Sequence, residues 1–147
     1  MKLPARVDTA LLALLSATFV AIGALHFVVG NLFAQIVPPP LPPLATVYAS
    51  GVAEIALGVL VALPRTRRLA AWGLVLLLVA VFPANVYMAT SGVTIEGLPS
   101  WMHQPSAAAR WARLPFQIVL VAWAFRFTRR PRRPALDEGR LEPMPFA

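Results

Sequence analysis

LATVYASGVAEIALGVLVAL, residues 44–63, is an apolar run in which Glu54 is the only charged residue. As an α-helix, a run of this length extends about 30 Å, which matches the hydrocarbon thickness of a bilayer. We therefore expect residues 44–63 to cross a membrane as a helix. A carboxyl group at its centre is the feature that needs an explanation.

Three further apolar runs, residues 9–30, 69–90 and 111–127, flank this segment. The first is longer than the apolar region of a signal peptide, so we expect an uncleaved helix. The last is the shortest, and bilayer thinning or snorkelling arginines would accommodate it. The proline-rich segment 38–43 ends the first helix, and the turn 64–68 makes a hairpin of the second and third. The sequence thus predicts an all-α, integral membrane four-helix bundle.

The composition agrees with a protein that lies mostly in lipid. Of its 147 residues, 59% are hydrophobic and 13% are charged, which excludes an ordinary soluble domain. We expect a short N-terminus at 1–8, a transmembrane domain at 9–128, and a basic, disordered tail at 129–147. The chain has no cysteine, so it cannot itself supply a disulfide, a thiolate nucleophile or a thiolate metal ligand.

The basic residues predict the orientation of the four spans. Of the 13 lysines and arginines, only Arg110 and Arg113 fall on one side of the predicted membrane, and the other 11 fall on the opposite side. The positive-inside rule therefore places both termini and the 64–68 turn in the cytoplasm. Anionic lipid headgroups explain the arginines of the tail, and we expect no nucleic-acid partner.

Each predicted span contributes one polar side chain that we take as informative: His26, Glu54, Asn85 or Gln117. A carboxylate at the centre of a membrane helix costs about 2.5–3.5 kcal/mol even on the lenient insertion scale, so Glu54 should face the other helices. Ionisable residues at this depth are functional-site hypotheses by default. Asn85 and Gln117 have a second interpretation, as amides that hydrogen-bond between helices and hold them together.

The residues around His26 and Glu54 predict that their helices meet. Gly23 lies one turn before His26, and Gly51 and Gly58 flank Glu54 on its own face, which allows close helix packing. Helical side chains lean toward the N-terminus of their helix, so the two side chains approach one depth from opposite directions. We predict contact between them, directly or through one water.

The two amides add to the same outer half of the membrane. Asn85 and Gln117 each lie about one turn from the outer end of their helix by the rise per residue. Pro83 leaves the carbonyl of Val79 without its helical partner, which offers the amides a backbone acceptor. We therefore predict one polar cluster of all four residues. A metal site is not expected, because one histidine, one carboxylate and the distant His103 do not form a zinc ligand set.

Four stretches together resemble a known family. They are Gly23-Ala-Leu-His-Phe27, Ile36-Val-Pro-Pro39, the Gly51–Gly58 segment around Glu54, and Pro64-Arg-Thr-Arg-Arg-Leu-Ala-Ala71. Over about residues 9–128 the chain is similar to the DoxX-like family of small bacterial integral membrane proteins. The resemblance implies a four-helix bundle in the bacterial cytoplasmic (cell inner) membrane. It also implies kinship with subunits of quinone-linked sulfur oxidation or of oxidative-stress complexes. The histidine and glutamate of the family-like stretches correspond to His26 and Glu54.

These observations lead to one functional hypothesis and two alternatives. We hypothesise a membrane subunit with an outer-leaflet pocket for a lipophilic ligand such as a quinone, working beside redox partner proteins. His26 and Glu54 would hydrogen-bond to the ligand or exchange protons with it, and Asn85 and Gln117 would orient it. The alternatives are a proton-coupled small transporter acting as a dimer and a structural membrane protein without a ligand. The sequence leaves open whether the protein is an enzyme.

Overall fold

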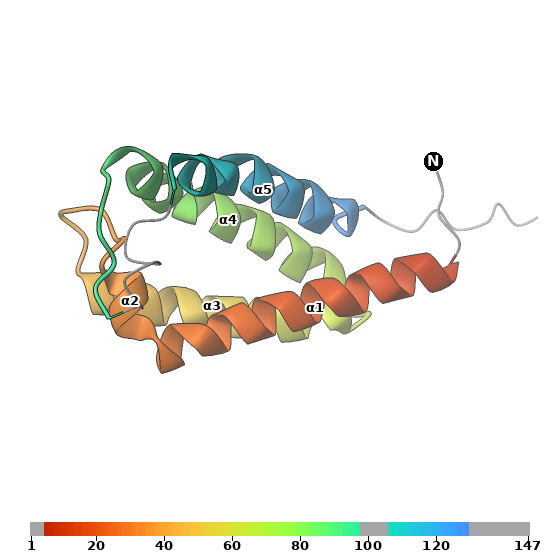
Figure 1. The fold of residues 1–147 in the computed structure, drawn as a ribbon. Helices are drawn as coiled ribbons and strands as arrows, with labels where there is room; N and C mark the ends of the chain where they lie inside the picture. Colours follow the sequence, from red (N-terminus) through yellow and green to blue (C-terminus); the bar gives the residue numbers. More distant parts are fainter. Residues whose placement is uncertain (1–4, 98–105, 130–147) are drawn as a thin grey trace, which may run out of the picture.

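The computed structural model describes residues 5–97 and 106–129, and every regular element in these ranges is helical (Figure 1). The predicted all-α class is therefore confirmed. The tail beyond residue 129 and His103 lie outside the described residues. The helices are α1 (Ala5–Val28), α2 (Gly30–Ala34), α3 (Pro43–Ala62), α4 (Arg67–Thr90) and α5 (Ala107–Arg126).

Three helices are long and apolar enough to cross a membrane: Arg6–Val28 of α1, Pro43–Ala62 (α3) and Arg67–Thr90 (α4). They correspond to the first three predicted spans, and they identify a membrane protein. The fourth predicted span lies in α5, which is not among the three. Helix α5 also contains Arg110, Arg113 and Arg126, which lower its mean hydropathy.

The first predicted span is not one continuous helix. The backbone leaves the helical conformation at Val29 (φ −123°, ψ 33°), and α2 begins at Gly30. At Gly30 the chain passes so close to α3 that an added Cβ would lie 2.9 Å from Cε1 of Tyr48. The chain thus changes direction between α1 and α2 where it contacts α3. An apolar run alone does not predict this change.

The long helices pack on one another in chain order, with α1 against α3, α3 against α4 and α4 against α5. Figure 1 shows the α1/α3 pair and the α4/α5 pair close together where α1 begins and diverging toward α2. We call the first end the basic pole; it holds the start of α1, the α3–α4 turn and the end of α5. We call the other end the loop pole. The buried apolar core lies in the half toward the basic pole and consists of Leu12, Leu15, Phe19, Val61, Ala70, Ala71, Leu74, Leu78, Leu120 and Ala124.

Side chains at the basic pole connect helix ends to one another. Arg67 donates to the carbonyls of Val61 and Ala62, which belong to the last turn of α3 and lack helical partners. Asp8 near the start of α1 forms an ion pair with Arg126 at the end of α5. This pair joins the first and last helices of the described chain.

One reciprocal pair of hydrogen bonds spans the loop pole. The Glu96 amide donates to Gln35 Oε1 at 2.8 Å, and Gln35 Nε2 donates to the Glu96 carbonyl at 3.0 Å. The segment that follows α4 therefore runs across to the end of α2, as the green trace in Figure 1 shows. It connects the two diverging helix pairs at the end where they are farthest apart.

Candidate functional site

The site begins with a close crossing of α1 and α3. A Cβ added at Gly51 would lie 2.7 Å from the His26 Cβ and 2.9 Å from the Gly23 carbonyl oxygen. A Cβ added at Gly23 would lie 2.8 Å from the Gly51 carbonyl oxygen, so each glycine accommodates the other helix. Further along, the Ser16 hydroxyl donates to the Gly58 carbonyl at 2.7 Å. The predicted meeting of the two small-residue stripes is confirmed.

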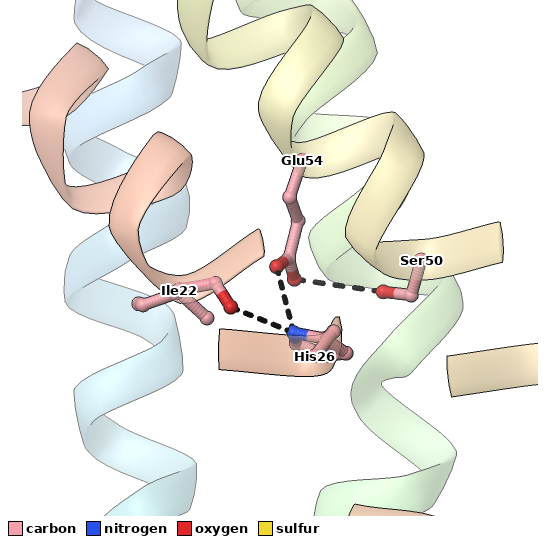
Figure 2. Close-up of polar contacts among 4 residues, drawn as sticks. All are labelled: Ile22, His26, Ser50 and Glu54. Atoms are coloured by element: carbon pink, nitrogen blue, oxygen red, sulfur yellow. Dashed lines mark hydrogen bonds and ion pairs between the residues drawn. The ribbon is translucent and has the colours of Figure 1, made fainter. Parts of the chain in front are cut away.

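This crossing brings His26 and Glu54 into contact (Figure 2). His26 Nδ1 lies 3.3 Å from Glu54 Oε2, and 12% and 10% of the two side chains are exposed. The predicted contact is therefore confirmed, and it is direct. Because an added Cβ at Gly51 would collide with the His26 Cβ, the absence of a side chain there leaves room for the histidine.

The two oxygens of the Glu54 carboxyl are poorly supplied with hydrogen-bond donors. Oε1 lies 3.5 Å from the Ser50 hydroxyl, at the limit of hydrogen-bond distance. Oε2 is fully buried and accepts no hydrogen bond, although the ring nitrogen of His26 is 3.3 Å away. Buried polar atoms normally have a hydrogen-bond partner, so Oε2 is an exception that must be explained.

The reason is a second acceptor at the same ring nitrogen, Nδ1. Nδ1 of His26 is 2.8 Å from the Ile22 carbonyl oxygen, one turn earlier on α1 (Figure 2). A ring nitrogen carries at most one hydrogen, and the Ile22 carbonyl only accepts, so that hydrogen belongs to the shorter contact. The contact between Nδ1 and Oε2 is then electrostatic, and Oε2 is left without a donor.

Aromatic rings from α1, α2 and α3 lie near the pair. The Phe33 ring stacks on the His26 imidazole with 4.5 Å between centroids and 11° between planes. Phe27 stacks on Tyr48 at 5.5 Å in the same region. Sequence reasoning missed Phe33, because it lies in α2, beyond the break at Val29, where helical spacing from His26 no longer applies. With Phe33 on one face of the ring, a ligand would approach His26 by its edge or its other face.

Asn85 and Gln117 form a second pair, between α4 and α5. Asn85 Nδ2 donates to Gln117 Oε1 at 2.7 Å, and Gln117 Nε2 donates to the Leu78 carbonyl. Gln117 is 4% exposed. The predicted acceptor, the Val79 carbonyl, was wrong by one residue, because the amide reaches α4 one position farther from Pro83. Both ends of the Gln117 amide are thus used within the chain.

The four polar residues do not form the single cluster that the sequence predicted. In residues 5–97 and 106–129, no hydrogen bond or ion pair joins His26 or Glu54 to Asn85 or Gln117. The pairs belong to the two helix pairs that diverge toward the loop pole (Figure 1). The depth of each residue along its helix correctly indicated that the two members of each pair lie at the same level. It could not indicate which helices pack together.

The described residues contain no recognisable set of metal ligands. Within them, no group of three or more histidine, cysteine, aspartate or glutamate side chains is placed to hold a metal ion. The polar groups at the α1–α3 crossing are proton donors and acceptors. These donors and acceptors are one imidazole, one carboxyl group, one hydroxyl group and the Ile22 carbonyl.

Fold and site together define a small all-α membrane protein with a histidine–carboxyl pair at a glycine-lined helix crossing. Residues 15–128 match the model of a family described as a domain of unknown function, DUF8561, and the chain belongs to that family. The match includes all four polar residues and most of the described helices. Comparison with curated proteins and with solved structures gave no match.

Proposed function

We propose that this protein binds the polar head of a lipophilic ligand at His26 and Glu54, as a membrane subunit of DoxX-like type. The observation that carries the proposal is the buried Glu54 Oε2, which has no hydrogen-bond donor. An acceptor left unpaired in a buried site costs about 1–3 kcal/mol, and a ligand that donates a hydrogen bond there removes this cost. A hydroxyl on a ring, as in a reduced quinone, is one such donor.

His26 gives the site its second polar group. Its Nδ1 is engaged by Ile22, whereas Nε2 has no hydrogen-bond partner among the described residues. The side chain keeps 12% of its surface exposed, so the ring is not sealed from a ligand. With Nδ1 protonated, Nε2 is the acceptor in neutral histidine and a donor in the cation. The pair can thus offer both an acceptor and a proton-exchanging group to one ligand.

The proposal includes a topology. All four long helices would cross the membrane, α5 with snorkelling arginines at its ends, and both termini would lie in the bacterial cytoplasm. The basic pole would then face the cytoplasm, and His26 and Glu54 would lie toward the outer leaflet. Reporters fused after Leu41 and Ser100 should read as external, and those after Thr66 and at the C-terminus as cytoplasmic. One reversed reporter contradicts this arrangement.

Native mass spectrometry of the full chain from gentle detergent tests the ligand directly. We expect a bound non-phospholipid mass on the unaltered protein that is lost in both His26→Ala and Glu54→Gln. Ser16→Ala is the matched control, because it removes a hydrogen bond from the same α1–α3 interface without touching the pair. Retention of the mass in both site variants, or its equal loss in Ser16→Ala, contradicts a site at His26 and Glu54.

The same unpaired oxygen favours a second candidate, a proton-coupled small transporter acting as a dimer. A carboxyl group in hydrocarbon that lacks a donor can take up a proton and lose its charge, which is the elementary step of proton coupling. Purified protein in liposomes separates the two candidates. Substrate flux that requires a proton gradient and Glu54 supports the transporter, whereas a co-purified ligand without flux supports the binding subunit.

A further inference from the structure

The basic pole carries more positive charge than its own carboxyl groups neutralise. The exposed or half-exposed arginines there, among the described residues, are Arg6, Arg65, Arg67, Arg68, Arg126 and Arg129. The described acidic residues are Asp8, Glu54 and Glu96, and of these only Asp8 lies at this pole, where it pairs with Arg126. The described residues of this pole therefore carry an excess of positive charge, which an anionic surface would complement.

Two of these arginines flank a pair of aromatic rings between α4 and α5. Arg129 lies over the Phe125 ring, with 5.8 Å from its Cζ to the centroid. Phe125 meets Trp72 edge to face at 5.5 Å. Arg68 uses Nε to donate to the Thr128 carbonyl at 3.0 Å, which fixes the start of α4 against the end of α5. We call Arg68, Trp72, Phe125 and Arg129 the arginine–aromatic patch.

The patch is open to its surroundings on an apolar face. Trp72 and Phe125 are 42% and 40% exposed, and Leu69, on the same turn as Arg68, is 78% exposed. Neither Arg68 nor Arg129 is paired with a carboxylate of the described residues. The guanidinium groups of the patch thus lie at the ends of α4 and α5, and its exposed rings lie next to them, toward the middle of these helices.

We propose that the arginine–aromatic patch binds an anionic phospholipid, with the phosphate at Arg68 and Arg129 and the acyl chain along Trp72 and Phe125. Guanidinium groups donate paired hydrogen bonds to phosphate oxygens, and aromatic rings favour the depth of lipid headgroups. A soluble anion or an acidic peptide would use the arginines but not the exposed apolar face below them. This site is separate from His26 and Glu54, so it stands or falls independently of the proposed function.

The test compares thermal unfolding of the full chain in neutral detergent with added phosphatidylglycerol or phosphatidylcholine. We expect stabilisation by the anionic lipid at a lower concentration than by the zwitterionic one. One arginine near an anionic surface contributes enough to change apparent affinity about five-fold. Arg68→Gln and Arg129→Gln should each shift the half-saturating concentration by about that factor, and the double variant by more.

Arg65→Gln is the matched control, because it removes one charge from an exposed arginine of the same pole outside the patch. Arg68→Lys keeps the charge but loses the Nε donor to Thr128, so it should retain most of the lipid preference even if folding suffers. An equal shift in Arg65→Gln would mean a diffuse charge effect and overturns the patch. Two further results overturn the proposal. One is that phosphatidylglycerol and phosphatidylcholine stabilise the unaltered chain equally. The other is that glycerol phosphate or a polyglutamate peptide stabilises it as much as phosphatidylglycerol does.

Discussion

Replacing Gly51 by alanine tests how closely α1 and α3 must approach for the polar pair to form. The new Cβ would lie 2.7 Å from the His26 Cβ and 2.9 Å from the Gly23 carbonyl oxygen. Neither atom is the end of a flexible side chain, so the helices themselves must separate. Overpacking costs about 1–3 kcal/mol, and the better helix propensity of alanine returns up to about 1 kcal/mol. We expect a net loss of about 0–2 kcal/mol from these two terms.

Gly73→Ala in α4 is the matched control. Its Cβ would lie 2.6 Å from Cδ2 of Leu57, the far end of a side chain that can rotate away. Its stability should therefore stay unchanged or rise by up to about 1 kcal/mol. Gly23→Ala combined with Gly51→Ala should cost less than the sum of the single changes, because each glycine faces the other's carbonyl. Unfolding in mixed detergent micelles, followed by tryptophan fluorescence, measures all four variants.

A Gly51→Ala variant as stable as Gly73→Ala would refute this reasoning. It would mean that α1 and α3 can separate without cost, and the geometry of the His26–Glu54 contact would then not depend on the glycines. Additive losses at Gly23 and Gly51 would contradict it in a second way, since they would show that the two glycines do not share one crossing point.

Two other contacts allow predictions of the same kind. Gln117→Leu removes two hydrogen bonds, the one from the Asn85 amide and the one to the Leu78 carbonyl, so unfolding should become easier by about 1–3 kcal/mol. Asn85→Ala removes only one of them and should cost less; equal losses in the two variants would contradict this. Asp8→Asn should lower stability by only about 0–1 kcal/mol, less at high salt, because the ion pair with Arg126 is 43% and 34% exposed on its two sides; a salt-independent loss of several kcal/mol would show that the pair is effectively buried.

Much of the helix pattern could be predicted from the sequence because lipid imposes it. Long apolar runs must become helices there, since every backbone polar group has to be satisfied internally. The predicted spans accordingly agree with α3 and α4 to within a few residues at each end. Helix α5 begins earlier than predicted, at Ala107, where the Ser106 hydroxyl caps it by accepting from the Ala109 amide. That serine was a readable N-cap signal.

What could not be predicted depends on contacts between helices. The break at Val29 coincides with the close passage of Gly30 over Tyr48, which belongs to another helix. The pairing of His26 with Glu54 could be predicted, because the spacing of the glycines indicated the face on which each helix packs closely. The separation of this pair from Asn85 and Gln117 could not be predicted, since it depends on which helices pack against one another. Periodicity describes one helix at a time and does not contain that order.

The most direct measurement of the central claim is a double-mutant cycle on His26 and Glu54, with unfolding free energies of His26→Ala, Glu54→Ala and the double variant. Removing one member of a buried polar pair leaves the other without its partner, so each single change should be costly. The double change should cost less than the sum of the singles by about 0.5–3 kcal/mol, the range in which residues in contact couple. Losses that add within about 0.3–0.5 kcal/mol would show that the two residues are independent, and the proposal of one shared site would then be wrong.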